Sequence, residues 1–316
     1  MKNVEKAKMV IGEVQKVIVG KDECVETIMT AILAGGHILI EDIPGVGKTT
    51  MALAFAKAMN LKQNRVQFTP DVLPADITGF TMYNKQTDTF VYQQGAAMCN
   101  LLLADEINRT SPKTQSALLE VMEEGNVTVD GITREVPAPF IVIATENPIG
   151  SVGTQMLPES QLDRFMVCMS IGYPDPLEEI DIIRSRREEN PLELVRPALA
   201  DGELIQMQQD VTGIYIHDEV YRYIANLADA TRKSEMLELG ISPRGSLALA
   251  RMVQARAYLK GRQFVIPDDV AAVFSSVAIH RVRVSTKAKL NRKTEEDILA
   301  QILKEVPKPS PEKGTS

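Results

Sequence analysis

The sequence contains no tryptophan, only three cysteines and three histidines, and no long hydrophobic run. Cys24, Cys99 and Cys168 lie far apart and form no C-x-x-C pair, which indicates reduced thiols rather than a disulfide framework. The histidines are also scattered, and they predict no transition-metal site. No apolar stretch reaches the roughly 18 to 20 residues that a membrane-spanning helix needs, and the charged N-terminus contains no apolar signal-peptide core. We therefore expect a cytoplasmic protein without a membrane span.

Acidic residues outnumber basic residues by 42 to 35, which gives a net charge of −7. Domains that bind duplex nucleic acid usually carry a basic face, so we do not expect a nucleic-acid partner. The basic stretch at residues 280–293 departs from this balance, and we interpret it as a solvated face of a C-terminal helical region. The hydrophobic fraction of 44% is typical of globular proteins, and a length of 316 residues favours two domains.

Short apolar runs alternate with helical stretches in the first part of the chain. The runs that predict strands span residues 37–42, 64–69, 100–106, 139–148 and 165–172. This alternation predicts a parallel sheet covered by helices on both faces. Two other segments, 80–95 and 126–136, predict β-hairpins outside the core sheet. We expect an α/β domain over residues 1–190, a helical domain over 191–306 and a disordered tail over 307–316.

A glycine-rich turn, EDIPGVGKTT at residues 41–50, follows the first predicted strand. It matches the phosphate-binding loop (P-loop) pattern G-x-x-x-x-G-K-[ST], except that Asp42 replaces the first glycine. Backbone N–H groups after that position, the start of the next helix and the lysine hold the phosphates in such a loop. Lys48 is expected to reach the β- and γ-phosphates, and Thr49 to offer its hydroxyl to Mg²⁺. The predicted nucleotide-binding residues are Pro44, Gly45, Val46, Gly47, Lys48, Thr49 and Thr50.

Polar side chains also end two later strands. In LLLADE, Asp105 is expected to orient Mg²⁺, and Glu106 to polarise the attacking water as a general base. An Asp-Glu pair can instead begin a solvated helix, but the P-loop about 57 residues earlier favours the nucleotide interpretation. After IVIATE, Asn147 is expected to bind the γ-phosphate or position water, although it could equally begin an Asn-Pro turn.

Four segments together resemble the MoxR family of AAA+ ATPases: PGVGKTT, LLLADEINRTSPKTQSALLEVMEEGNVTVDG, IVIATENP and LPESQLDRF. The resemblance extends from about residue 10 to about residue 275, and the long second segment is far more specific than a P-loop alone. It implies a P-loop AAA+ αβα core with a parallel five-stranded sheet, hairpin inserts and a C-terminal all-helical lid domain. It also implies ATP hydrolysis with Mg²⁺ by a homo-oligomeric ring, usually a hexamer, with ATP at the subunit boundaries.

The resemblance also implies roles for individual residues. Asn147 corresponds to sensor 1, Arg164 to the arginine finger that reaches the neighbouring subunit's γ-phosphate, and Arg244 to sensor 2 on the lid. Both arginine roles require a permanent charge on a planar fork, which only arginine supplies. Val19 and Gly20 correspond to the residues that line the adenine.

Family members are typically associated with a partner that carries a von Willebrand factor A domain, and they act as chaperone-like remodellers or metal-insertion helpers. The tips of the two hairpins, Tyr83–Tyr92 and Val127–Val136, are expected to face the ring's channel or the partner. Arg109 is a further, weaker candidate for the subunit boundary. The alternatives are a related motor on DNA, a metal-chelatase subunit, a P-loop kinase of small molecules and a nucleotide-gated scaffold without hydrolysis.

Overall fold

A five-stranded sheet forms the centre of the amino-terminal part of the protein in the computed structural model, which describes residues 2–43, 45–147, 156–185 and 190–309. Its strands are β1 (Ile38–Glu41), β2 (Gln63–Gln67), β5 (Leu101–Asp105), β8 (Ile141–Glu146) and β9 (Val167–Met169). They lie in the order β2-β5-β8-β1-β9, and each neighbouring pair is parallel. The predicted parallel five-stranded sheet is confirmed.

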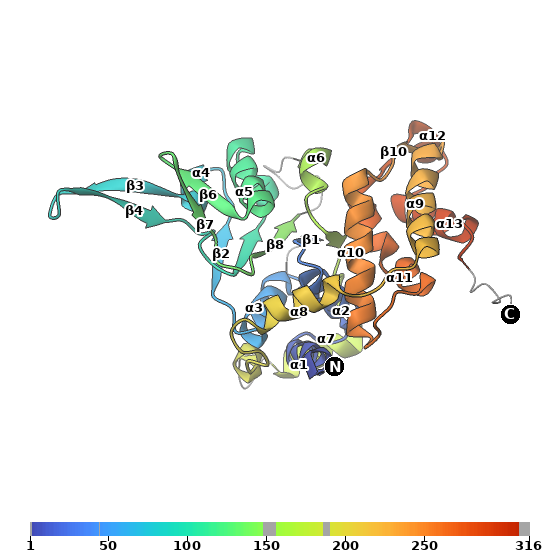
Figure 1. Cartoon of the computed structure of the whole chain (residues 1–316), viewed down its shortest axis with the longest axis horizontal. Helices are drawn as coiled ribbons and strands as arrows, with labels where there is room; N and C mark the ends of the chain where they lie inside the picture. Colours follow the sequence, from blue (N-terminus) through green and yellow to red (C-terminus); the bar gives the residue numbers. More distant parts are fainter. Residues whose placement is uncertain (1, 44, 148–155, 186–189, 310–316) are drawn as a thin grey trace.

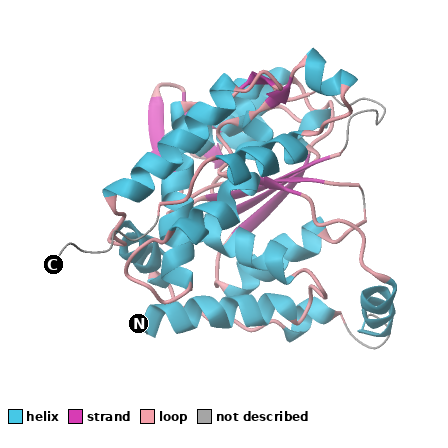
Figure 2. Cartoon of the chain, turned by 90° about the vertical axis from the view of Figure 1, so that its right-hand side faces the viewer, coloured by secondary structure: helices cyan, strands magenta, loops and turns pink. Residues whose placement is uncertain are grey.

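Helices cover both faces of this sheet, as Figure 2 shows. Successive residues of a strand point to opposite faces. Ile38 and Ile40 of β1 therefore join one core, while Leu39 between them joins the other. The first core includes α1 (Lys2–Gln15), α2 (Asp22–Leu33) and α3 (Lys48–Ala58), and the second includes α5 (Pro112–Glu124). The shorter elements are α4 (Pro74–Thr78), the 3-10 helix η1 (Ile107–Arg109), α6 (Glu159–Leu162), α7 (Pro176–Ser185) and the 3-10 helix η2 (Pro191–Leu194).

Both predicted hairpins are present beside the sheet. The first consists of β3 (Gly79–Asn84) and β4 (Thr89–Gln94), and it extends far from the body of the molecule (Figure 1). The second consists of β6 (Asn126–Val129) and β7 (Ile132–Glu135). Its turn, Asp130-Gly131, has positive φ angles of 52° and 75°, which explains the choice of these two residue types.

The carboxyl-terminal part consists mainly of helices whose buried side chains continue the first core. They are α8 (Glu203–Thr212), α9 (Asp218–Lys233), α10 (Pro243–Leu259), α11 (Pro267–Ala278), the 3-10 helix η3 (Ile279–Arg281), α12 (Thr286–Leu290) and α13 (Glu295–Glu305). None of the helices in the described ranges is long and apolar enough to cross a membrane. The domain division at residue 190 stays a prediction, and the predicted tail lies outside the described residues from 310 onward.

Two expectations for this part were wrong. The region is not entirely helical, because β10 (Leu237–Leu239) pairs antiparallel with β11 (Arg283–Val284). Strands of two or three residues are too short to give an alternating pattern in the sequence. The basic stretch 280–293 is also not one solvated face, since the Arg281 residue is only 5% exposed and His280 bonds the Phe165 carbonyl oxygen at 3.0 Å.

A buried histidine connects β1 to the strand and helix beside it. The backbone N–H of Val142 donates to Nδ1 of His37 at 3.0 Å, and Nε2 lies 3.0 Å from the Met122 carbonyl oxygen. A neutral ring with its hydrogen on Nε2 satisfies both contacts. Burial lowers the pKa of His37 to about 4, from its ordinary value of 6.5.

This histidine makes the fold sensitive to acid. Between its unfolded and folded pKa values the unfolded chain binds a proton that the folded chain excludes, so the free energy of unfolding falls as pH falls. The expected loss from His37 is about 1.4 kcal/mol per pH unit. His37→Asn should be less stable at neutral pH. Its free energy of unfolding, measured by urea titrations between about pH 6.5 and about pH 5, should fall less steeply with pH than that of the original protein. Equal slopes in the two proteins would contradict this prediction.

Candidate functional site

The predicted P-loop connects β1 to α3. Gly45 and Gly47 have φ angles of 92° and 94°, and Gly47 is the N-cap residue of α3. Apart from the adjacent chain, no heavy atom of the described residues would lie within 4 Å of a Cβ built at either glycine, so the space beside the loop is open in this part of the structure. Backbone N–H groups at the start of an 11-residue helix face an anion favourably. Pro44 lies outside the described residues.

The ammonium group of Lys48 is buried, and no carboxylate of the described residues is in direct contact with it. Its Nζ donates to the carbonyl oxygens of Asp42 at 2.5 Å and Glu146 at 3.2 Å, and it lies 3.5 Å from Oδ1 of Asn147. The residue is 8% exposed, and burial lowers its pKa although the nearby acidic groups oppose this shift. A desolvated cation whose partners are neutral oxygens is suited to a strongly negative ligand.

Asp105 lies at the end of β5 among three polar groups. Oγ1 of Thr49 is 3.4 Å from its Oδ2, and Oγ1 of Thr145 is 3.3 Å from its Oδ1. Nε of Arg65, on β2, donates to Oδ2 at 2.7 Å. A hydroxyl beside a carboxylate is a donor set that Mg²⁺ prefers, so the predicted metal residues Thr49 and Asp105 fit the ion. Arg65 was not among the residues predicted from the sequence, because its contact with Asp105 depends on the pairing of β2 with β5.

Glu106 has a backbone conformation that is uncommon for a residue other than glycine, with φ of 57° and ψ of 49°. Its N–H donates to Oγ1 of Thr145 at 2.9 Å, which holds the turn. Its carboxylate accepts hydrogen bonds from Nδ2 of Asn147 at 2.9 Å and from Nη1 of Arg109 at 2.7 Å. Burial alone would raise the pKa of Glu106, but the bonds from Arg109 and Asn147 outweigh it and lower the pKa. Strained residues held in this way cluster at active sites.

Asn147 connects the lysine to the acidic residues. The residue is 7% exposed, and its carbonyl oxygen accepts a hydrogen bond from Nδ2 of Asn108 at 3.0 Å. Its side chain lies between Glu106 and Lys48. Arg109, the weaker candidate for a subunit boundary, pairs with Glu106 of its own chain, and its place at a boundary stays a prediction. The structure thus brings Lys48, Thr49, Asp105, Glu106 and Asn147 together at one edge of the sheet.

Asp42, the residue that departs from the P-loop pattern, turns its carboxylate away from Lys48. Its Oδ2 accepts hydrogen bonds from the hydroxyl of Ser170 at 2.9 Å and from the N–H groups of Ile171 and Gly172, both at 2.7 Å. Its Oδ1 accepts one from the N–H of Ile43 at 2.8 Å. Burial opposes ionisation, but these bonds outweigh it and lower the pKa of Asp42. The carboxylate ties the start of the P-loop to the segment after β9.

The same segment reaches the residues predicted to line the adenine. Glu178 of α7 packs so closely on Gly20 that a Cβ there would lie 1.7 Å from its Oε1. Nζ of Lys21 donates to the carbonyl oxygen of Tyr173 at 2.8 Å. Val19 and Gly20 therefore lie on the side of the molecule where Asp42 holds the segment after β9. Val46 and Thr50 lie within the P-loop and the first turn of α3, partly exposed.

Arg164 and Arg244 lie together, away from the P-loop of their own chain. Nη1 of Arg164 is 2.6 Å from Oε2 of Glu123, and Nη2 of Arg244 is 2.5 Å from Oε1 of the same carboxylate. The cavity beside them has a volume of 370 Å³ and is also lined by Gly36 and His37, which precede β1. The P-loop follows β1, so the arginines and the P-loop lie at opposite ends of that strand.

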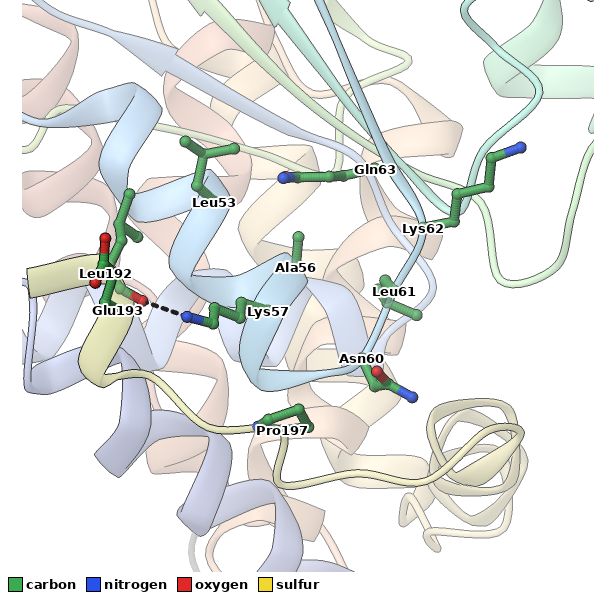
Figure 3. A pocket seen from close by; sticks show the side chains of 10 residues that line it. All are labelled: Leu53, Ala56, Lys57, Asn60, Leu61, Lys62, Gln63, Leu192, Glu193 and Pro197. Carbon is green, nitrogen blue, oxygen red and sulfur yellow. Dashed lines mark hydrogen bonds between the residues drawn. The ribbon is translucent and has the colours of Figure 1, made fainter. Parts of the chain in front are cut away.

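A larger cavity of 560 Å³ lies elsewhere, on the outer side of α3 (Figure 3). Nζ of Lys57 donates to the carbonyl oxygen of Leu192 across it at 2.7 Å. It contains none of the residues predicted from the sequence, and it is lined by Leu53, Ala56, Lys57, Asn60, Leu61, Lys62, Gln63, Leu192, Glu193 and Pro197. The candidate site is therefore the open P-loop and not this cavity.

Comparisons with known proteins agree with this geometry. Residues 37–167 match the family described as ATPases associated with various cellular activities (AAA), and residues 229–302 match the AAA lid domain. YeaC of Bacillus subtilis is 44% identical over 95% of this chain and 93% of its own length. Chaperone MoxR1 of Mycobacterium tuberculosis is 38% identical over 97% of this chain and 84% of its own length.

A solved structure supports the same assignment. A crystal structure of a Cytophaga hutchinsonii protein superimposes with a TM-score of 0.90 and 33% sequence identity. The match covers 98% of this chain and 96% of that one. The predicted fold class, an AAA+ core followed by a lid domain, is therefore confirmed.

The hydrogen bonds of Asp42 predict that restoring the usual glycine will damage the site. Asp42→Gly removes four hydrogen bonds to the carboxylate and releases the P-loop from the segment after β9. Bonds to charged groups contribute about 1.5 to 3 kcal/mol each, so we expect nucleotide affinity to fall by about tenfold or more, together with a lower melting temperature. Fluorescent nucleotide titration measures the affinity. The matched control is Asp71→Gly at an exposed position, which should bind as the original protein does. Unchanged affinity in Asp42→Gly would contradict the prediction.

Proposed function

The chain belongs to the MoxR family of AAA ATPases, and from this membership we propose that it hydrolyses Mg·ATP as a hexameric ring and remodels partner proteins. One observation carries the proposal: Arg164 and Arg244 lie at the opposite end of β1 from the P-loop. A phosphoryl transfer site needs cations around the γ-phosphate. At this edge of the sheet Lys48 contacts neutral oxygens, whereas Arg65 and Arg109 are already paired with Asp105 and Glu106. In the proposed ring, Arg164 and Arg244 of another copy supply the further positive charge.

We assign the steps of hydrolysis to side chains of two subunits. The loop from Gly45 to Thr50 binds the phosphates, and Lys48 contacts the β- and γ-phosphates. Thr49 and Asp105 would hold Mg²⁺, and the bound ion would neutralise charge on the phosphate oxygens. The ionised Glu106 accepts a proton from the water whose oxygen bonds to the γ-phosphorus, while the bond from that phosphorus to the bridging oxygen breaks and ADP leaves. The strained turn that presents Glu106 is already formed.

The remaining roles concern sensing and completion of the site. Asn147 orients both Glu106 and Lys48 through its side-chain contacts, in agreement with the sensor 1 role. Arg164 and Arg244 of one subunit approach the γ-phosphate held by the next. Arg244 thus acts between subunits alongside Arg164, because its position on the same carboxylate keeps it away from its own P-loop. Head-to-tail contacts of this kind generate a closed ring when the rotation from one subunit to the next closes on itself.

The projecting hairpin β3–β4 is the surface that we propose for contact with the partner or with the channel of the ring (Figure 1). Apolar and aromatic side chains remain exposed along it: Phe80, Met82, Tyr83, Phe90 and Val91. Exposed apolar groups on one projecting element are typical of interaction sites. We propose a protein with a von Willebrand factor A domain as the partner.

Mixing of inactive variants tests the shared site. Glu106→Gln should bind ATP without hydrolysing it, and Arg164→Ala should lose activity because the neighbour's γ-phosphate lacks its arginine. An equal mixture creates some boundaries with an intact P-loop side and an intact arginine side. If subunits exchange at random, we expect about a quarter of the boundaries to be active in a head-to-tail ring. Phosphate release measures the activity, and assays of each variant alone serve as controls. A mixture as inactive as its components, or full activity of Arg164→Ala, would overturn the proposed ring mechanism.

A further inference from the structure

Arg281 on η3 is a charged group in the interior with every N–H donor bonded. Nε donates to Oδ1 of Asp163 at 2.8 Å. Nη1 donates to the carbonyl oxygens of Met166 at 3.1 Å and Val277 at 2.5 Å. Nη2 donates to the carbonyl oxygens of Asp163 at 3.1 Å and Phe165 at 2.5 Å. A guanidinium has five N–H donors, so this one is fully satisfied.

Four of these five bonds hold the short segment that carries Arg164. Their acceptors belong to Asp163, Phe165 and Met166, on both sides of Arg164 in the chain. We call these contacts of Arg281 the Arg281 joint. The Arg164 side chain takes no part in them and pairs with Glu123. Arg281 thus fixes the backbone on which the proposed finger stands, without contacting its guanidinium.

The same joint reaches the helix that carries Arg244. The hydroxyl of Ser242, the N-cap of α10, donates to Oδ2 of Asp163 at 2.9 Å and accepts from the N–H of Gly245 at 3.1 Å. A Cβ at Gly245 would lie 2.7 Å from Cδ of Arg281, so the arginine stem rests directly on the first turn of α10. Asp163 is therefore bonded at once to the lid helix and to Arg281.

We propose that Arg281, through Asp163 and Ser242, is a positioning residue that sets Arg164 and Arg244 in one fixed arrangement for the triphosphate of the adjacent subunit. This inference rests on the proposed function. Two arginines on separate elements, α10 and the loop after α6, must present their planar forks in register to one phosphate. The Arg281 joint links the backbones of these two elements, whereas Glu123 links only their side-chain tips.

The chemistry of the joint distinguishes this role from simple packing. A buried charged pair often stabilises a fold no better than well-packed apolar residues of similar volume, so stability alone does not call for an arginine here. A lysine would keep the charge but has three donors on a single nitrogen and cannot reach acceptors on both sides of Arg164. Loss of the planar fork should therefore disturb the position of Arg164 more than the stability of the protein.

Arg281→Lys is the test variant. We expect kcat to fall by about tenfold or more, because small displacements of a catalytic group have large effects on rate. Binding of fluorescent ATP analogue to the variant's own P-loop should change by less than about twofold, since no bond of that loop is altered. Ser242→Ala is a second, milder variant with the same expected pattern. Thr294→Ala, which removes only the N-cap of α13 in the same region, is the matched control and should keep full activity.

Subunit mixing provides a readout that a purely structural role would not give. Arg281→Lys should regain activity when mixed with Glu106→Gln, whose arginines are intact, and should regain none with Arg164→Ala, which has the same defective side. Wild-type kcat in both Arg281→Lys and Ser242→Ala, or recovery with Arg164→Ala, would overturn the inference. If Arg164→Ala itself hydrolyses ATP normally, the proposed function fails instead. Melting temperatures of all variants identify any that are unfolded. If Arg281→Lys is unfolded, the kcat and the mixing behaviour of Ser242→Ala test the inference in its place.

Discussion

The parallel register of β1, β5 and β8 is the constraint on which the candidate site depends. Ala104 pairs with Ala144, and Glu41 pairs with Glu146, so these strands end at one edge of the sheet. Asp105, Asn147 and the P-loop then follow at that edge. A slip of one residue would reverse the direction of every side chain in a strand. The buried apolar residues on both faces of the sheet therefore also fix the positions of the polar groups at its edge.

The polar groups at this edge divide into those that bind each other and those that remain free for a ligand. The carboxylate of Asp42 accepts hydrogen bonds from backbone N–H groups, and only the carbonyl oxygen of Asp42 contacts Lys48. Glu106 is held between Asn147 and Arg109. Among the described residues, a Cβ built at Gly45 or Gly47 would contact nothing within 4 Å, so the space beside these P-loop glycines is open. Acidic side chains thus shape the site while its phosphate-binding donors remain available, which explains how a carboxylate can replace the first P-loop glycine.

The sequence predicted the parts of the site that depend on contiguous residues. The five strands, both hairpins and the grouping of Lys48 with Asp105 followed from local patterns, because each motif continues a strand of known direction. Contacts between distant segments could not be predicted in this way. Hydrophobic periodicity indicates that a side chain is buried but not what it contacts. The contact of Arg65 with Asp105 and the contacts of Arg281 were therefore not predicted. Arg281 belongs to the basic stretch 280–293, whose composition is typical of a charged surface.

Strand β9 connects the two halves of the chemistry within one subunit. The N–H of Met166, just before β9, donates to the carbonyl oxygen of His37 at 2.8 Å, and the Arg281 joint holds the same end. At the other end, Asp42 binds the N–H groups of Ile171 and Gly172. An extended strand of three residues spans about 10 Å and cannot stretch further. Strand β9 therefore joins the segment that Asp42 holds at the P-loop entrance to the backbone that carries Arg164. In the ring that we propose, this connection would link the nucleotide held by one subunit to the arginine that the same subunit offers to its neighbour.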